Sequence, residues 1–216
     1  MASDTVCLQR RGALFVVSGP SGAGKTSISL PAIERLGGIR LSVSVTTRRP
    51  RTGERDGIDY TFVSEDEFAA LAAANGFAES AEVHGFHYGT PRSAIEEAES
   101  AGIDLLLDID VQGAAQLRRG FPQAVLIFLL PPSRERLLER LSARGTDSEP
   151  TMQRRSEAAV AEITELANYD YVIVNESLDR AVDAFVGIVS SERRRVRLLR
   201  PECVARVAQA FKGKPG

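Results

Sequence analysis

The chain has 216 residues, of which 43% are hydrophobic, a length that suits one well-buried core and is short for two. Its formal net charge of −2 gives no general reason to expect nucleic acid or an anionic membrane as a partner. No apolar stretch approaches the roughly 18 residues that a membrane-spanning helix needs. Cys7 and Cys203 lie near opposite ends, which excludes a disulfide framework, so we expect a protein of the reducing cytoplasm.

A buried strand, a glycine-rich loop and a helix are predicted in succession near the start of the chain. Residues 13–18 form a continuous apolar run that ends at Gly19. Residues 19–26 read Gly-Pro-Ser-Gly-Ala-Gly-Lys-Thr, which fits the phosphate-binding pattern G-x-x-x-x-G-K-[ST]. Residues 24–36 then have apolar positions at helical spacing, ended by two glycines. The elements therefore occur in the order that a phosphate-binding loop requires.

The composition of this loop indicates that it binds a nucleoside triphosphate. Glycines let consecutive backbone N–H groups converge on an anion, and the start of the helix adds the positive end of its dipole. Lys25 is the only lysine in the first 211 residues, which indicates a compact, flexible cation selected over arginine for the outer phosphates. The predicted ATP-binding residues are Gly19, Pro20, Ser21, Gly22, Ala23, Gly24, Lys25 and Thr26, the last with a hydroxyl that can ligate Mg²⁺. The alternative is a glycine-rich turn between two core elements.

Pro31 conflicts with a regular helix over residues 24–36. Its ring removes one backbone hydrogen bond and crowds the preceding turn. We therefore expect a kink or a break near residues 27–31.

The pattern of the chain changes between residues 41 and 93. Short alternating segments, such as 41–46 and 60–62, are separated by turn residues, which predicts an inserted β-rich lobe. Within it, three arginines lie between residues 48 and 51, beside hydroxyl-bearing residues. Planar guanidinium groups can donate two parallel hydrogen bonds to a phosphate, so the cluster is a candidate acceptor site; the alternative is a solvated loop.

The rest of the chain alternates strands with helices. Apolar runs of strand length lie at 103–107, 125–130 and 171–174, and each is followed by a helical pattern. This alternation predicts an α/β protein with a parallel sheet covered on both faces. A polar stretch at 143–150 indicates a second small insertion, and the segment 190–216 either extends the last helix or mediates association.

Six segments resemble guanylate kinase, in the same order and with similar spacings over nearly residues 12–200. They are GPSGAGKT, SVSVTTRRPRTGERDGIDYTFVS, FAESAEVHGFHYGTPRSAI, LLLDIDVQGA, PPSRERLLERLSARGTD and YVIVNESLD. That family has a P-loop NTPase fold and transfers phosphate from ATP to GMP. The resemblance implies one domain, with a core of residues 12–40, 94–142 and 156–211, a GMP-binding lobe of 41–93 and a lid of 143–155.

The resemblance also implies two groups of GMP-binding residues. Those for the GMP phosphate are Arg48, Arg51, Tyr60 and Tyr88, with Glu54 bracing the arginines. Those for the guanine base are Ser44, Glu79, Thr90 and Asp110. A carboxylate at Glu79 can accept from the N1–H and 2-amino groups of guanine, donors that adenine lacks on that edge. By residue type alone, the tyrosines would be core residues with a wet hydroxyl, and Glu54 and Glu79 would be exposed acids.

On the donor side, the matching positions surround the transferred phosphate. The catalytic candidates are Lys25, Arg48, Arg140, Arg144 and Arg155, and Asn175 matches a residue near the adenine of ATP. Without the resemblance, Arg140 and Arg144 belong to a solvent-facing row paired with acids on the same helix, and Asn175 ends a strand. Asp108 closes a buried strand, where it could orient Mg²⁺ or cap the following helix.

We therefore expect Mg²⁺-dependent transfer of the γ-phosphoryl group of ATP to GMP, in purine nucleotide metabolism and GMP recycling. The expected partners are ATP and GMP, with dGMP and a homo-oligomer left open, and neither nucleic acid nor membrane. One alternative is a scaffold-type interaction module, against which the complete phosphate loop argues. The other is a kinase for a ribose bisphosphate, which would not need a guanine-reading set.

Overall fold

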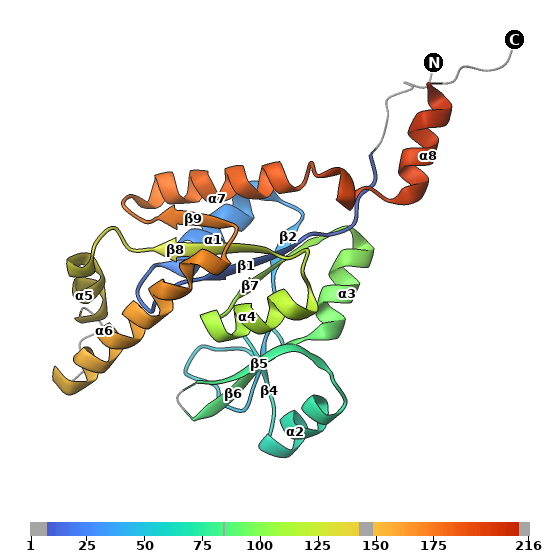
Figure 1. Cartoon of the computed structure of the whole chain (residues 1–216). Coiled ribbons are helices and arrows are strands. Elements are labelled where there is room, and N and C mark those ends of the chain that lie inside the picture. Colours follow the sequence, from blue (N-terminus) through green and yellow to red (C-terminus); the bar gives the residue numbers. More distant parts are fainter. Residues whose placement is uncertain (1–7, 84, 143–148, 212–216) are drawn as a thin grey trace, which may run out of the picture.

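Five strands that lie far apart in the sequence pair to form the central sheet (Figure 1). The computed structural model describes residues 8–83, 85–142 and 149–211. The strands are β1 (Leu14–Ser18), β2 (Ile39–Leu41), β7 (Asp104–Asp108), β8 (Val125–Leu130) and β9 (Tyr171–Val174). They lie in the order β2-β7-β1-β8-β9, and every neighbouring pair is parallel. The predicted α/β class with a parallel sheet is confirmed.

Eight α-helices connect and cover the strands in the described ranges. They are α1 (Lys25–Leu36), α2 (Glu65–Ala73), α3 (Arg92–Ala101), α4 (Val111–Gly120), α5 (Arg134–Ser142), α6 (Glu149–Thr164), α7 (Leu178–Glu192) and α8 (Pro201–Ala210). Two short 3-10 helices, η1 (Glu165–Asn168) and η2 (Val196–Leu198), follow α6 and α7. No helix in the described parts of the chain combines the length and the apolar character needed to cross a bilayer.

Alternate residues of β1 build the two halves of the core. Phe15 and Val17 face a cluster to which α1 and α7 contribute, whereas Leu14 and Val16 face a cluster formed with α3 and α4. Both faces of the sheet are therefore covered by helices, as Figure 1 shows. This double burial is why β1 and β8 are continuous apolar runs without polar alternation.

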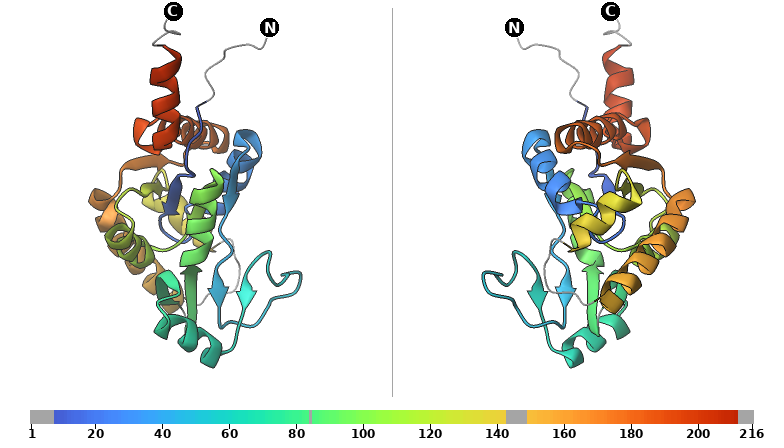
Figure 2. Two further views of the ribbon diagram at one scale, coloured as in Figure 1. Left: turned by 90° about the vertical axis from the view of Figure 1, so that its right-hand side faces the viewer. Right: turned by 90° about the vertical axis from the view of Figure 1, so that its left-hand side faces the viewer.

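A second sheet carries the short segments that the sequence placed in an inserted lobe. It contains β3 (Val45–Thr46), β4 (Thr61–Phe62), β5 (Phe77–Val83) and β6 (Phe86–Pro91), in the order β4-β3-β6-β5. Phe68 of α2 stacks on Phe77 of β5 with ring centroids 4.5 Å apart, which gives this sheet a small core of its own. Figure 2 shows the sheet and α2 at the end of the molecule opposite α8.

Helix α1 corrects the expectation for Pro31. The helix runs without interruption from Lys25 to Leu36 with Pro31 inside it, so the expected break is wrong, while the kink stays a prediction. Ile28 and Ala32 on its inner face are fully buried in the core cluster. We infer that this burial outweighs the loss of one backbone hydrogen bond at the proline.

The predicted second insertion is described only in part. Residues 143–148, with Arg144, lie outside the described residues. Helix α6 begins at Glu149, so the backbone at position 155 is helical.

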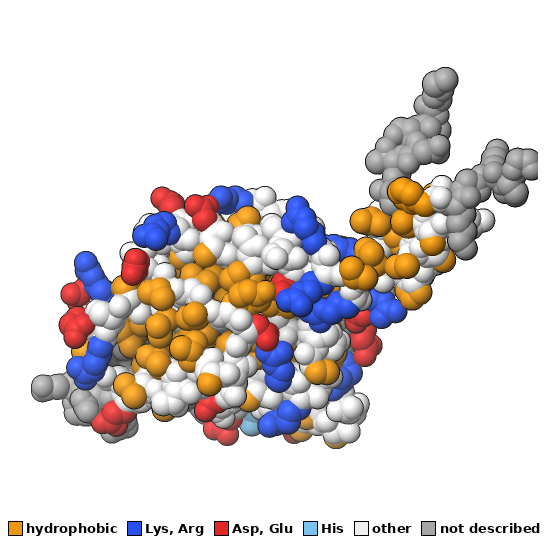
Figure 3. Space-filling model, turned by 45° about the horizontal axis from the view of Figure 1, so that its top comes forward, with side chains coloured by type: hydrophobic (Ala, Val, Ile, Leu, Met, Phe, Trp, Pro, Cys, Tyr) orange, Lys and Arg blue, Asp and Glu red, His pale blue; other side chains and the backbone are white. Residues whose placement is uncertain are grey.

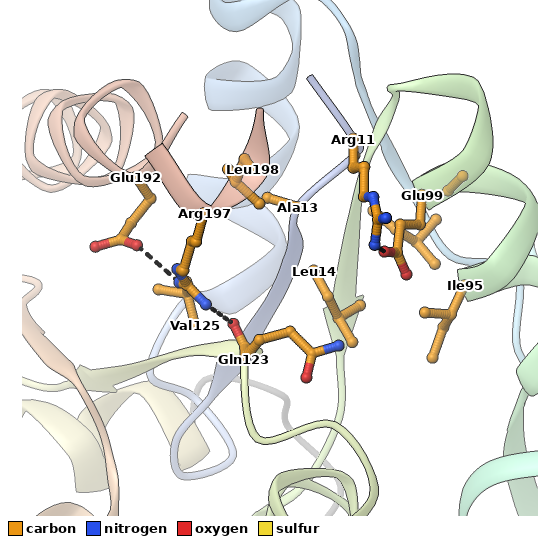
Figure 4. A pocket seen from close by; sticks show the side chains of 13 residues that line it. Arg11, Ala13, Leu14, Ile95, Glu99, Gln123, Val125, Glu192, Arg197 and Leu198 are labelled. Carbon is orange, nitrogen blue, oxygen red and sulfur yellow. Dashed lines mark hydrogen bonds and ion pairs between the residues drawn. The ribbon is translucent and has the colours of Figure 1, made fainter. Parts of the chain in front are cut away.

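The segment before β1 and the segment after α7 meet at the amino edge of the sheet. Asp104, fully buried at the start of β7, accepts hydrogen bonds from the guanidinium groups of Arg10 and Arg193 and, at 2.8 Å, from the backbone N–H of Ala13. A hollow of about 200 Å³ lies beside this junction (Figure 4). At its rim, Arg11 and Arg197 pair with glutamates, so this hollow carries little net charge.

The C-terminal segment forms a helix separate from α7, which ends at Glu192. Helix α8 projects from the body (Figure 1) and buries Cys203, whose sulfur accepts a 3.3 Å hydrogen bond from the backbone N–H of Gln9. Hydrophobic side chains gather on the surface of α8 in Figure 3, among them Val204, which is 48% exposed.

Candidate active site

The glycine-rich loop joins the carboxyl end of β1 to the first turn of α1. Gly24 precedes the helix with φ of 92°, a left-handed conformation, and no side chain caps the helix start. A Cβ at Gly24 would lie 2.5 Å from Nδ2 of Asn175, so glycine is also required for space. Asn175 Nδ2 donates to the carbonyl of Ala23 at 2.8 Å and holds the loop from the side. The backbone N–H groups at the helix start therefore remain available to an anion.

Lys25 lies across this loop and faces acidic side chains. Its Nζ donates to the carbonyl of Gly19 at 2.9 Å. Asp108, at the end of the neighbouring strand β7, approaches the Thr26 hydroxyl at 3.4 Å. Burial raises the pKa of Asp108, while the charge of Lys25 and the Thr26 hydroxyl lower it. The loop thus places one cation, one hydroxyl and one carboxylate at the carboxyl edge of the sheet.

The two interpretations of Asp108 can now be compared with the geometry. The cap of α4 is Asp110, whose Oδ1 accepts from the backbone N–H of Gly113 at 2.8 Å. The capping role considered for Asp108 therefore belongs to Asp110. The Thr26 hydroxyl and the Asp108 carboxylate are oxygen donors of the kind that Mg²⁺ prefers, so the residues fit this ion. Mg²⁺ is usually bound by one or two carboxylates together with substrate phosphates and water. No cluster of three or more His, Cys, Asp or Glu suited to a metal occurs in the described ranges.

A network of side chains fixes Arg48 after β3. Arg48 is 8% exposed as a whole residue, and its guanidinium group donates to Glu54 at 2.8 and 3.0 Å, in a two-pronged pair. Its Nε donates to the Tyr88 hydroxyl at 3.2 Å, and it lies 5.3 Å from the ring centre of Tyr60. Glu54 also accepts from the backbone N–H of Arg51 at 2.7 Å. The hydrogen bonds from Arg48 and Arg51 hold the pKa of Glu54 below its usual range.

This network leaves donors for a ligand. The Tyr88 hydroxyl accepts from Arg48, so its own proton remains free to be donated. The Arg51 side chain is exposed and makes no hydrogen bond or ion pair with any described residue. The phenol of Tyr88 and the exposed guanidinium group of Arg51 are therefore available beside the positive charge of Arg48, which suits a dianionic phosphate.

Glu79 is a buried carboxylate in β5. It is only 6% exposed, so the assignment as a surface acid by residue type alone is wrong. Its Oε1 accepts from the Thr90 hydroxyl at 2.6 Å, while Oε2 accepts from no described residue. Burial raises the pKa of Glu79; hydrogen bonding to the hydroxyl and to the backbone of Thr90 lowers it, and the nearby Asp110 raises it. One carboxylate oxygen is thus held in place and the other is open to a donor.

Gly113 allows Glu79 to lie this close to the start of α4. A Cβ at Gly113 would come within 2.5 Å of Glu79 Oε2 and 3.4 Å of Asp110 Oδ1. The two carboxylates therefore lie side by side below the helix start.

A single cleft of about 950 Å³ joins these parts. The predicted site residues that line it are Gly19, Ser21, Gly22, Gly24, Lys25, Thr26, Ser44, Tyr60, Glu79, Tyr88, Asp108, Asp110, Arg140 and Asn175. Arg48 and Thr90 stand behind this lining and contact it through Tyr88 and Glu79. Pro20 and Ala23 belong to the loop itself, where the Ala23 N–H donates to the Pro20 carbonyl at 2.9 Å. Most of the predicted donor and acceptor residues are therefore brought together, whereas Glu54 and Arg51 do not line the cleft and are connected to it through Arg48.

Arg140 faces the phosphate loop from α5. Its guanidinium group donates to the carbonyls of Ala23 at 3.4 Å and Asn175 at 3.2 Å. The alternative was a solvent-facing row of Arg140 and Arg144 paired with Glu135 and Glu139; the two hydrogen bonds of Arg140 to the loop region argue against it for Arg140. The predicted roles of Arg144 and of the Arg155 side chain concern atoms outside the described part of the chain.

The cleft also contains residues that the sequence analysis did not select. Glu82, Gln112, Glu162 and Glu176 line it. Glu162 could have been found from its spacing, because it lies about two helical turns after position 155 in α6.

Comparison with known proteins agrees with this geometry. The family model described as guanylate kinase matches residues 11–192. The chain belongs to the guanylate kinase family. It is 50% identical over 195 residues to a guanylate kinase of Syntrophotalea carbinolica, covering 90% of this chain and 93% of that protein. It is also 50% identical over 185 residues to a guanylate kinase of Thermus thermophilus, covering 86% of this chain and 84% of that protein.

A solved structure supports the same assignment at the level of the fold. The guanylate kinase of Anaplasma phagocytophilum superposes with a TM-score of 0.74 at 34% identity, covering 89% of this chain and 92% of that one. The resemblance found in the sequence and the P-loop NTPase fold are thus confirmed. The chain is a nucleotide-binding kinase of the guanylate kinase family, which excludes the scaffold-type module as its main role.

Proposed function

We propose that this protein transfers the γ-phosphoryl group of ATP to GMP, with Mg²⁺, to give ADP and GDP. The observation that carries the proposal is the single cleft in which the phosphate loop and the buried carboxylate of Glu79 both take part. One end of the cleft has the features of a triphosphate site and the other has the features of a base-reading site. A phosphoryl transfer between two nucleotides needs both in one enclosure.

At the donor end, ATP phosphates would lie on the N–H groups at the start of α1. Lys25 would leave the Gly19 carbonyl and reach the outer phosphates. Mg²⁺, held through Thr26 and Asp108, would supply neutralising charge to the phosphate oxygens. Asn175 would lie near the adenine while it continues to brace the loop.

At the acceptor end, the GMP phosphate would bind to the Arg48 network and Arg51. Tyr60 and Tyr88 would add neutral hydroxyl donors. The acceptor phosphate has a second pKa of about 6, so it is largely ionised at neutral pH and needs no general base. Catalysis would then come from positioning two anions and from stabilising their charge.

The guanine base would be read by the open oxygen of Glu79. Thr90 fixes the other oxygen of that carboxylate, and Asp110 and Ser44 line the same region. With AMP bound, the open oxygen of the buried Glu79 carboxylate would have no hydrogen-bond donor. Leaving a buried acceptor unpaired destabilises the complex with AMP. GMP should therefore be strongly preferred to AMP.

Closure would bring the remaining cations to the transferred phosphate. Arg140 already lies beside the loop, and Arg144 and Arg155 would arrive with the lid. Closing on both substrates would exclude water as a competing acceptor. We place this activity in the cytoplasm, in purine nucleotide metabolism and GMP recycling.

One assay tests the proposal. ATP and Mg²⁺ are offered with GMP, dGMP, AMP, CMP, UMP or a ribose bisphosphate, and ADP formation is followed. We expect fast turnover with GMP, little with AMP and the pyrimidine nucleotides, and none when EDTA removes Mg²⁺. Turnover only with the sugar bisphosphate, or ATP hydrolysis at the same rate with and without GMP, would overturn it.

A further inference from the structure

Glu162 is a cleft residue to which no role has been given above. It lies in the last turn of α6, is partly buried and lines the cleft that holds the phosphate loop. Its carboxylate takes part in no hydrogen bond or ion pair with any described residue. A cleft carboxylate with all its acceptor positions open is suited to a ligand that donates hydrogen bonds.

Two features make this position unfavourable for a negative charge. Burial raises the pKa of Glu162, and the nearby Asp110 raises it further, while the charge of Lys25 lowers it. No hydrogen bond within the described residues compensates for these costs. Local features that a fold keeps at a cost are concentrated at functional sites.

The surroundings of Glu162 limit the donors that it can meet. Asp110, which lines the same cleft, lies beside the base-reading carboxylate of Glu79. Lys25, which also lines it, belongs to the phosphate loop. The charges of both residues act on Glu162, so Glu162 shares the cleft with the base-reading end and with the transfer end.

The chemistry of the acceptor nucleotide leaves one pair of donors for this place. The guanine N1–H and 2-amino groups are directed to Glu79 in the proposed function. The phosphate offers acceptor oxygens and repels a carboxylate. The 2′- and 3′-hydroxyls of the ribose are the remaining donors, and they lie on adjacent carbons that a carboxylate can bridge. We propose that Glu162 accepts hydrogen bonds from these ribose hydroxyls and so makes the enzyme prefer GMP to dGMP, an inference that rests on the proposed function.

The experiment measures kcat/KM for GMP, 2′-deoxy-GMP and 3′-deoxy-GMP at saturating ATP and Mg²⁺. In the unmodified protein, we expect GMP to exceed each deoxy form by about tenfold, the size of one charge-assisted hydrogen bond. Glu162→Ala should bring the ratios close to one, mainly by lowering the value for GMP. Glu162→Gln keeps an acceptor oxygen without the charge and should give intermediate ratios.

Glu97→Gln is the control, because it removes a carboxylate from an exposed position of α3 that does not line the cleft. Its GMP to dGMP ratio should equal that of the unmodified protein. The inference is overturned if the ratios of Glu162→Ala match the unmodified protein, or if the unmodified protein does not discriminate. It is equally overturned if Glu162→Ala changes the preference for ATP over dATP instead.

Failure of the proposed function gives a different result, since the unmodified protein would then transfer no phosphate to GMP at all. Calorimetric binding of GMP and dGMP to the unmodified protein gives a second readout that does not depend on how the variants fold. Equal affinities for the two nucleotides would also overturn the role of Glu162.

Discussion

In the phosphate loop, most groups that face a ligand are backbone N–H groups, whereas in the acceptor half of the cleft they are side chains held by other side chains. The loop takes its shape from adjacent residues and needs one distant brace, Asn175. The acceptor half depends on Glu54 for Arg48 and on Thr90 for Glu79. Substitutions in the phosphate loop should therefore mainly lower turnover. Substitutions in the acceptor half should mainly alter which acceptor is chosen and how tightly it binds.

The largest effect is expected for Lys25→Ala, which removes the cation of the phosphate loop. We expect kcat to fall by about 10²–10³-fold, because one preorganised charge at the transferred phosphate is lost. The Kd for GMP should stay within about twofold, since the acceptor half is untouched. Steady-state kinetics and calorimetric binding of GMP measure the two quantities.

Lys25→Arg separates charge from shape at the same position. A planar fork cannot reproduce a compact ammonium inside the loop, so this variant should also lose most of its turnover. Full activity with arginine would show that only charge matters there.

The second largest effect is expected for Glu79→Gln, which alters the acceptor half of the cleft. The amide offers one acceptor and one donor where guanine presents two donors, so GMP should lose about a hundredfold in kcat/KM relative to AMP. The measurement is the ratio of kcat/KM for the two acceptors. An unchanged ratio would mean that guanine is read elsewhere.

A smaller effect is expected for Glu54→Gln, which weakens the support of Arg48 without touching the ligand. The loss of the two-pronged pair should let the guanidinium group move and raise KM for GMP by about tenfold. The kcat for bound substrates should change less. Asp66→Asn, at an exposed position of α2 in the same lobe, is the control; an equal rise in both variants would contradict the bracing role.

The smallest effect concerns stability and pH. Burial raises the pKa of Glu79 above its ordinary value. The ionised form of Glu79 therefore destabilises the folded protein at pH values above that ordinary pKa. Glu79→Gln should therefore unfold less readily than the unmodified protein at pH 7, and a pKa raised by one corresponds to about 1.4 kcal/mol. The gain should shrink as the pH falls towards the ordinary pKa of a glutamate, 4.5, because the carboxyl group is then increasingly neutral in the folded protein.

Thermal unfolding of the nucleotide-free protein at several pH values measures this difference. A Glu79→Gln variant that is less stable than the unmodified protein at pH 7 would show that the carboxylate is structural. The opposite outcome would show that the acceptor half retains a costly group for its substrate.

The elements that sequence reasoning found were those defined by local pattern. The strands β8 and β9 begin and end where the apolar runs do. Strand β8 is an apolar run because it is buried on both faces of the sheet. Strand β9 lies at the edge of the sheet and buries only Ile173, so its apolar run does not reflect burial on both faces. The phosphate loop was found because its residues are contiguous. The break predicted at Pro31 does not occur, because the sequence reveals the local cost of a proline but not the packing of Ile28 and Ala32 that offsets it.

Features that depend on contacts between distant residues escaped. Nothing around Glu79 indicates burial, which comes from α4 lying against β5 and from the absence of a side chain at Gly113. Likewise, the sequence left Asp108 with two roles, and only the start of α4 shows that Asp110 is the cap. Side-chain networks of this kind are specified by tertiary packing, so periodicity cannot reveal them.

The junction at Asp104 has a consequence for the order in which the chain is made. This buried carboxylate needs Arg10, synthesised before it, and Arg193, synthesised long after it. During translation, β7 can pair with β1 while its first residue still lacks one of its two cations. A carboxylate left partly unpaired in a forming core is costly, so the sheet should stay open to water at that edge until α7 has left the ribosome. Asp104 would then delay the final closure of this edge of the sheet until Arg193 has been synthesised.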